Sequence, residues 1–170
     1  MSLEDFNSRI LPVKSKMFRF ALKFMKSKEE AEDVIQEVLI KVWKQQNRLG
    51  ELLNFEAWCM KLVKNQSLDR LKSVHYRNQA ASINPELPSE NKNPYQHAEM
   101  GNSIQRVHQL INSLPEKQKE IIHLRDVEGY AYQEIADIMD IDLNMVKVYL
   151  FRARNTIKAK LINAEAYGNR

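Results

Sequence analysis

The stretch between Asn144 and Asn155 holds side chains whose chemistry suits contact with nucleic acid. At the α-helical period one helix face would carry Asn144, Lys147, Val148, Phe151, Arg152 and Asn155. Amide and cationic groups donate hydrogen bonds to base edges, and apolar atoms contact the methyl group of thymine. The pattern therefore predicts a helix that reads a DNA major groove. An amphipathic helix with a solvated basic face has the same pattern, and this stretch alone leaves both interpretations open.

Two helices must position this face. The opposite side of the same helix is apolar and is expected to point inward, with Val146, Leu150, Ala153, Ile157 and Leu161. A shorter helix begins at Tyr132 and is expected to bury Ile135, Ala136 and Met139. Residues 140–143 form a tight turn between the two, so the order predicts a helix-turn-helix.

A second set of polar and aromatic side chains lies on a helix expected from about Phe55 to Arg77. One side carries Trp58, Lys61, Asn65, Asp69 and Lys72, and the buried side carries Cys59, Val63, Ser67, Leu71 and Val74. A ring, an amide and lysines together suit single-stranded nucleic acid, through stacking, hydrogen bonds and charge. The alternative is that Trp58 is a core residue and the lysines are solvated, since large aromatic residues are mostly buried.

A third set lies on a helix over 28–44, which the Ser27–Glu30 capping pattern begins. Its inner stripe is Ala31, Val34, Ile35, Val38 and Val42, and its outer face carries Asp33, Gln36, Glu37, Ile40 and Lys44. Ile40 is either an ordinary exposed isoleucine or the apolar centre of a docking surface with a polar rim.

The whole chain reads as all-α, with two small helical domains joined by a flexible linker. Residues 1–77 form the first domain, in which a helix over 3–26 contains Pro12, as its start or as a kink. Residues 78–102 hold three of the five prolines and no helical stripe, which indicates the linker. Residues 103–170 form the second domain, which contains the helix-turn-helix.

Composition narrows the function classes. Residues 103–142 hold 4 Lys and Arg against 8 Asp and Glu, whereas residues 144–170 hold 6 against 1, which indicates two kinds of partner. A single cysteine excludes a disulfide framework, and no apolar run is long enough for a bilayer, so a cytoplasmic setting is expected. Cys59 and the four histidines have no metal-ligand spacing, so we expect no catalytic residue, metal or cofactor.

Taken together, the chain resembles the extracytoplasmic-function sigma factors, the small two-domain members of the bacterial sigma family. The runs that carry the resemblance are AEDVIQE at 31–37, KVW at 41–43, FEAW at 55–58, LDRL at 68–71, LPE at 114–116, LRDVEG at 124–129, YQEIA at 132–136, VK at 146–147 and RAR at 152–154. Their order and the linker between them cover nearly the whole chain.

The resemblance implies roles for the first domain. The helix over 28–44 would dock on core RNA polymerase through Asp33, Gln36, Glu37, Ile40 and Trp43. The loop from Arg48 to Asn54, with Trp58 and Asn65, would hold a base flipped out of the minus-ten element. Lys61 and Lys64 would hold the backbone of that strand.

For the second domain the resemblance implies reading of the minus-thirty-five element. The residues concerned are Asn144, Lys147, Val148, Phe151 and Arg152, with Arg154 placed for phosphates. The implied partners are core polymerase, promoter DNA and an anti-sigma factor, which could hold the protein at the membrane without any membrane insertion of its own. A repressor or activator that binds duplex DNA without polymerase is the alternative, but it leaves the first domain unused.

Several departures from the family pattern concern the second domain. The family often has Gly-Thr where this chain has Asn144-Met145, and small or basic residues where it has Val148-Tyr149, so base preference does not transfer. Ala131 stands where a Ser or Thr cap is usual, which costs the next helix about 1 kcal/mol. Asp140 stands where glycine is frequent, and aspartate tolerates the left-handed conformation that this turn needs.

Overall fold

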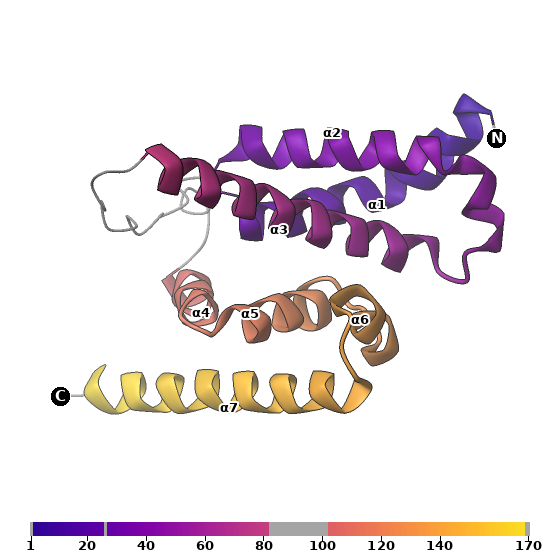
Figure 1. Ribbon diagram of the computed structural model, residues 1–170. Coiled ribbons are helices and arrows are strands. Elements are labelled where there is room, and N and C mark those ends of the chain that lie inside the picture. Colours follow the sequence, from indigo (N-terminus) through magenta and orange to yellow (C-terminus); the bar gives the residue numbers. More distant parts are fainter. Residues whose placement is uncertain (1, 26, 82–101, 169–170) are drawn as a thin grey trace. The chain divides into compact units, whose positions relative to one another are not determined.

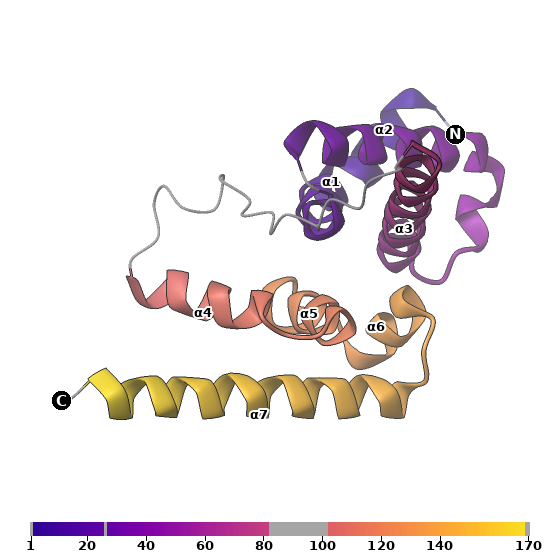
Figure 2. The ribbon, with the colours of Figure 1, turned by 60° about the vertical axis from the view of Figure 1, so that its left-hand side comes forward.

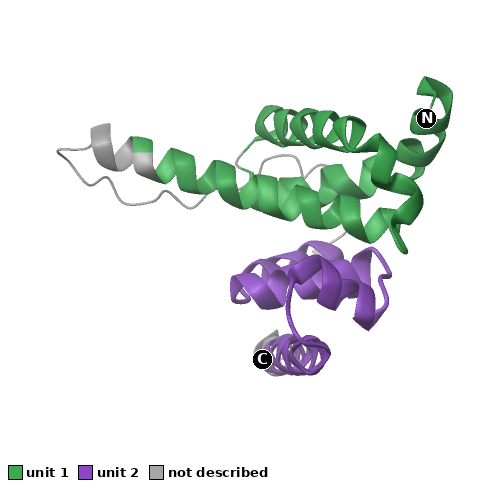
Figure 3. Ribbon diagram, turned by 45° about the vertical axis from the view of Figure 1, so that its right-hand side comes forward, with its two compact units in different colours: residues 1–93 green, residues 94–170 purple. Residues whose placement is uncertain are grey.

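The computed structural model describes residues 2–25, 27–81 and 102–168. All regular secondary structure in these ranges is helical, as predicted. The chain divides into two compact units, residues 1–93 and residues 94–170 (Figure 3).

The N-terminal unit is built from three long helices (Figure 1). They are α1 (Leu3–Phe24), α2 (Lys28–Lys44) and α3 (Phe55–Ala81), with a short 3₁₀ helix η1 (Gln46–Glu51) before α3. Each long helix packs against the other two, as the second view also shows (Figure 2). The core is fully apolar at its centre, where the largest buried side chains are Met17, Phe20, Val34, Val38, Val42, Met60 and Val63.

Local capping explains where these helices begin. The Ser2 hydroxyl accepts a hydrogen bond from the Asp5 N–H at 3.1 Å, and the Asp5 carboxylate accepts one from the Ser2 N–H at 3.1 Å. The expected cap of α2 is present, since the Ser27 hydroxyl accepts from the Glu30 N–H at 3.1 Å. Pro12 lies inside α1, so of the two expected alternatives the interior position is correct.

The C-terminal unit contains α4 (Asn102–Asn112), α5 (Glu116–Ile122), α6 (Tyr132–Met139) and α7 (Leu143–Gly168). A single π turn over His123–Val127 follows α5. Both views show α7 running alongside α4 and α5, and it contacts them as well as α6 (Figures 1 and 2). The core contains Leu114, Ile121, Leu124, Ile135, Ile138, Val146 and Leu150.

The expected buried side of α3 is correct only for its first half. Cys59, Val63 and Ser67 are buried, but Leu71 is 37% exposed and Val74 is only half-buried. At this level α3 still lies alongside α2, since Arg70 is paired with Asp33 and Glu37, but the contacts there are between polar side chains. The end of α3, which has 27 residues against 17 in α2, projects beyond its neighbour (Figure 1).

Helix α3 continues through Ala81, four residues past its expected end at about Arg77, and α4 begins at Asn102. Residues 82–101 lie outside the described residues. Among the described helices, none combines the length and apolar character needed to cross a membrane.

Candidate functional surfaces

Helix α2 presents the outer face that its periodicity predicted. Val34, Val38 and Val42 have no exposed surface, whereas Ile40, on the opposite side, is 55% exposed. Asp33 and Gln36 are exposed beside it. Ile40 is therefore an apolar residue surrounded by polar ones, which is the anatomy of a small docking surface.

The acidic groups on this face are tied to α3. Arg70 Nη2 lies 2.9 Å from Asp33 Oδ2, and Arg70 Nη1 lies 3.3 Å from Glu37 Oε1. The second oxygen of Glu37 accepts a hydrogen bond from Gln66, whose own oxygen accepts one from Lys41. Both carboxylates are thus held in fixed positions within the unit, which the sequence pattern did not indicate.

Trp43 does not lie fully open on this face. It is half-buried, and its ring meets that of Phe6 edge-on, with centroids 5.2 Å apart at 88°. Edge-to-face pairs of this kind stabilise a fold beyond the area that they bury. Trp43 therefore joins α2 to the start of α1, and a docking partner would reach only part of its ring.

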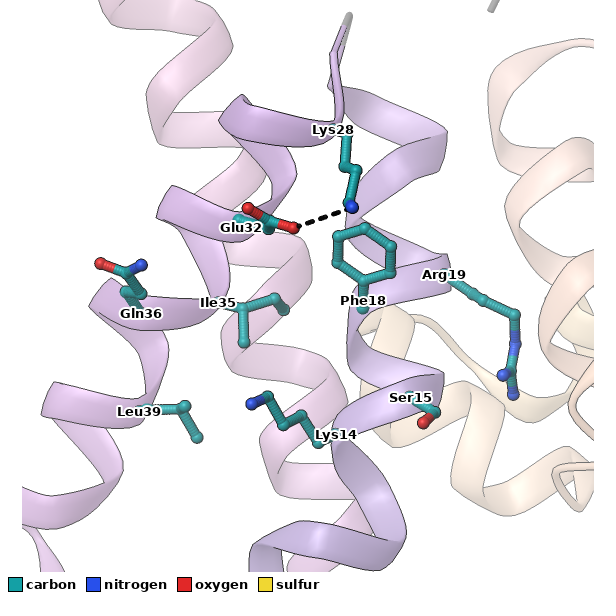
Figure 4. A pocket seen from close by; sticks show the side chains of 9 residues that line it. All are labelled: Lys14, Ser15, Phe18, Arg19, Lys28, Glu32, Ile35, Gln36 and Leu39. Carbon is teal, nitrogen blue, oxygen red and sulfur yellow. Dashed lines mark ion pairs between the residues drawn. The ribbon is translucent and has the colours of Figure 1, made fainter. Parts of the chain in front are cut away.

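A groove of about 550 Å³ continues from this face between α1 and α2 (Figure 4). Its lining combines apolar side chains with three cations, and consists of Lys14, Ser15, Phe18, Arg19, Lys28, Glu32, Ile35, Gln36 and Leu39. Lys28 forms an ion pair with Glu32 at 3.6 Å, which Figure 4 marks. Because Gln36 belongs to both the groove and the outer face of α2, the two form one continuous surface.

The side of α3 that was expected to meet a DNA strand is partly accessible. Asn65 is exposed, and Lys61 and Trp58 are half-buried. The ring of Trp58 lies against that of Phe55 at a tilt, with centroids 6.3 Å apart, and part of it remains open for stacking. Trp58 is therefore not one of the fully buried core residues.

Lys64 does not belong to that accessible side. It is only 7% exposed, because it follows buried Met60 by four residues and precedes buried Ser67 by three. Residues at these spacings share one helix face, so Lys64 lies on the inner face. The expectation that it holds a strand backbone is not supported by this position.

The loop before α3 carries a further residue that the sequence analysis missed. Leu53 is fully exposed, whereas Leu49 in η1 is buried and anchors the loop. Asn54 then caps α3, since its side-chain oxygen accepts from the Ala57 N–H at 2.9 Å. Arg48 is exposed on η1, as expected. The sequence did contain a signal for Leu53, because this apolar residue stands in the loop directly before the residue that caps α3.

The second unit presents the predicted outer face of α7. Asn144, Lys147 and Arg152 are exposed, Val148 is 37% exposed and Phe151 is 68% exposed. The inner side is buried at Val146, Leu150 and Ala153. A 68% exposed phenylalanine next to an arginine and a lysine leaves apolar and donor groups together on the surface, as base recognition requires.

The turn before α7 has the expected geometry. Asp140 adopts the left-handed conformation, with φ 59° and ψ 48°, which aspartate tolerates better than most residues. The Asp142 carboxylate accepts from the Asn144 N–H at 2.7 Å and so begins α7. Ala131 has no side chain with which to cap α6, but the Glu134 carboxylate accepts from the Ala131 N–H at 2.7 Å.

Arg154 is held within the unit rather than open for a phosphate. Its Nη2 and Nε lie 2.6 and 3.2 Å from the two oxygens of Asp126, in the π turn. This forked hydrogen bonding to Asp126 raises the pKa of the Arg154 guanidinium above its usual value. In the free protein the guanidinium that was expected to contact a phosphate thus ties α7 to the turn after α5.

The groups that an enzyme would need are poorly placed. Cys59 has no exposed surface, and burial, with a smaller contribution from Glu56, raises the pKa of its thiol to about 12. His123 is also buried, with its Nε2 3.3 Å from Glu128 Oε1. His97 lies outside the described residues.

Comparison with known proteins explains why the two units carry different surfaces. Residues 11–76 match the family described as Sigma-70 region 2, and residues 104–157 match Sigma-70 region 4. The ECF RNA polymerase sigma-E factor of Haemophilus influenzae is 29% identical over 79% of this chain and 76% of its own length. The chain belongs to the extracytoplasmic-function sigma factors.

Other similar proteins agree with this family. The RNA polymerase sigma-H factor of Pseudomonas aeruginosa is 26% identical over 92% of this sigma factor and 86% of its own length. Among solved structures, the sigma factor RpoE of Bartonella quintana, crystallised with the anti-sigma factor NepR, has a TM-score of 0.73. That match covers 94% of this sigma factor and 98% of RpoE at 24% identity, so it shows the shared fold.

Membership of this family establishes the function at the level of the whole protein. This sigma factor binds core RNA polymerase and directs it to promoters, where transcription is initiated. The all-α fold in two units has the organisation of that family, with region 2 in the first unit and region 4 in the second.

Proposed function

We propose that the two units of this sigma factor bind different partners through the faces described above. The N-terminal unit would dock on core polymerase and hold the minus-ten element, and the C-terminal unit would read the minus-thirty-five element. What supports this division is that each unit has at least one helix whose outer face carries exposed apolar and polar groups together.

The docking surface would be the outer face of α2, centred on Ile40 and rimmed by Asp33, Gln36 and Glu37. The groove between α1 and α2 extends it, because Gln36 lines both. Trp43 would contribute only the part of its ring that Phe6 leaves uncovered. A partner would gain apolar contact at the centre and polar contacts around it.

The minus-ten strand would run along Lys61 and Asn65, with a flipped base on the open part of the Trp58 ring. Arg48 and Leu53, exposed in the preceding loop, would contact the same strand. Flipping a base costs a few kcal/mol of lost stacking and pairing, and these contacts would have to offset that cost. Strand opening would thus be driven by binding energy without nucleotide hydrolysis.

The upstream element would be read by the exposed face of α7. Arg152 and Lys147 would donate to base edges, and Phe151 and Val148 would contact thymine methyl groups. Asn144, at the first turn of α7, would add an amide donor. Arg154 is left out of this set, because Asp126 holds its guanidinium on two sides.

Regulation by an anti-sigma factor is part of the proposal. The similar chain RpoE was crystallised with the anti-sigma factor NepR, and the similar chain CnrH was solved in complex with the cytosolic domain of CnrY. We infer a comparable partner here, with the protein in the cytoplasm or held at the membrane by that partner. The protein would have no catalytic residue, metal or cofactor of its own.

Run-off transcription is the direct test. Core RNA polymerase would be given genomic DNA fragments with and without this protein. New transcripts that start at discrete positions are expected only when it is present. If instead the protein alone protects a duplex operator and leaves polymerase unaffected, the alternative of a repressor or activator is correct.

A further inference from the structure

The packing of α3 changes character halfway along its length. Up to Ser67 its inner face is buried against α1 and α2, but Leu68 and Leu71 are 36% and 37% exposed. Among residues 68–75 and 77 of α3, none is buried. Hydrophobic burial therefore stabilises the first half of α3 and leaves the second half with little apolar packing.

Polar contacts take over where the apolar packing ends. The guanidinium of Arg70 bridges Asp33 and Glu37, which are one turn apart on α2, at 2.9 and 3.3 Å. Gln66, one turn before Arg70, donates to the other oxygen of Glu37 and accepts from Lys41. The five residues form a ladder between α2 and α3, which we call the Arg70 ladder, and Arg70 is its last rung on α3.

The ladder joins the two surfaces that the proposed function assigns to different partners. Its α2 side carries Asp33 and Glu37, on the rim of the docking surface. Its α3 side lies on the helix that carries Trp58, Lys61 and Asn65. A planar guanidinium with two fixed partners restrains the rotation of one helix against the other more tightly than a single charge does.

We propose that Arg70 is a positioning residue, which holds the second half of α3 on α2 so that polymerase docking and strand capture occur in a fixed geometry. Arg70 itself contacts neither partner. This inference rests on the proposed function of the two faces. It also explains why both oxygens of Glu37 have partners inside the unit, although Glu37 lies on the docking surface.

Hydrogen exchange tests the structural half of the inference. In Arg70→Ala, amides of residues 68–77 should exchange about five- to tenfold faster than in the wild type, because local opening loses a charged network. Amides of residues 57–67 should be unchanged, since apolar packing protects them. Arg70→Lys, which keeps the charge and loses the fork, should lie between the two.

Arg77→Ala is the matched control, because it removes the same charge from the same helix. Arg77 lies beyond the ladder, where its guanidinium lies 3.4 Å from the backbone oxygen and the hydroxyl of Ser73. The Arg77→Ala variant should leave the exchange of the amides of residues 57–73 unchanged. Equal acceleration in both variants, or faster exchange throughout α3 in Arg70→Ala, would overturn the inference.

Promoter opening tests the functional half. Holoenzyme would be formed at saturating concentrations of each variant, and open complexes would be scored by permanganate reactivity of unpaired thymines. Arg70→Ala should lower the yield of open complexes by about fivefold, in line with the faster exchange expected for this variant. Arg77→Ala should give the same yield as the wild type. Normal opening by Arg70→Ala despite faster exchange would refute the positioning role.

The two levels of the account can fail separately. If the wild-type protein opens no promoter with core polymerase, the proposed function fails, whatever the variants do. If the wild type opens promoters and Arg70→Ala behaves like Arg77→Ala in both assays, only the positioning role fails.

Discussion

Replacing Ile40 by aspartate separates docking from folding. Ile40 lies on α2 opposite Val34, Val38 and Val42, which have no exposed surface. The new carboxylate would therefore point to solvent in the free protein, where it costs little. Aspartate has a somewhat lower helix propensity than isoleucine, which amounts to a few tenths of a kcal/mol. The free energy of unfolding should change by less than about 1 kcal/mol.

The effect on binding should be much larger. Ile40 is 55% exposed. This leaves about 100 Å² of mainly apolar area for a partner to cover, worth roughly 2.5 kcal/mol at about 25 cal/mol per Å². Aspartate forfeits that term and adds the cost of removing a carboxylate from water at the centre of an interface. The dissociation constant for core polymerase should therefore rise at least about 100-fold.

Titration of labelled protein with core polymerase measures this constant, with circular dichroism and a thermal melt as the check on folding. Leu11→Asp is the matched control. Leu11 is 67% exposed on α1, is not among the residues that line the groove, and should bind as the wild type does. An Ile40→Asp protein that is folded and binds core polymerase with unchanged affinity would show that α2 does not dock.

Three further predictions concern other parts of the chain. Arg152→Ala should weaken holoenzyme binding to one upstream sequence by about 1–3 kcal/mol relative to others, as gel shifts on promoter variants would show, and a uniform loss would make Arg152 a phosphate contact. Arg154→Ala should lower the free energy of unfolding, measured by denaturant titration, by about 0.5–1 kcal/mol without changing sequence preference. Ala131→Ser should stabilise the C-terminal unit by about 1 kcal/mol, because a hydroxyl can cap α6; a denaturant midpoint that stays the same would contradict this. Cys59, with its pKa raised to about 12, should stay a neutral thiol at pH 8 and react with a thiol reagent only when the protein is unfolded; rapid labelling of the folded protein would show that it is accessible.

Helical periodicity was enough to predict which residues of α2 and α7 point outward. Ile40 and Phe151 were expected on outer faces and are 55% and 68% exposed. Such faces depend on spacing within one element, which a single sequence shows directly. The left-handed turn at Asp140 was expected from the resemblance, because glycine is frequent at that position and aspartate tolerates the conformation.

The features that the sequence did not reveal depend on contacts between elements. Arg154 and Asp126 are 28 residues apart, and Arg70 and Asp33 are 37 apart. Periodicity shows that such side chains are near a surface, but it does not show which charge they meet across a helix interface. For the same reason Trp43 was expected to be open, although Phe6 from α1 covers part of its ring.

Burial along α3 was misjudged because a helical stripe does not reveal which side chains the neighbouring helix presents at each level. The stripe continues to Leu71 and Val74, yet at that level α2 meets α3 through the ion pairs of Arg70 with Asp33 and Glu37, and Leu71 stays 37% exposed. The resemblance assigned Lys64 to the strand backbone, but its position between buried Met60 and Ser67 places it on the inner face of α3, where it is only 7% exposed. In both cases helix packing decided the outcome over residue type.

The central claim is that one unit of this sigma factor engages polymerase while the other reads duplex DNA. Footprinting of a promoter found by run-off transcription, combined with permanganate probing, tests it most directly. We expect upstream protection and reactive thymines in the minus-ten region only when core polymerase and the protein are both present. Protection of the same DNA by the protein alone, with no thymine becoming reactive when polymerase is added, would contradict the account.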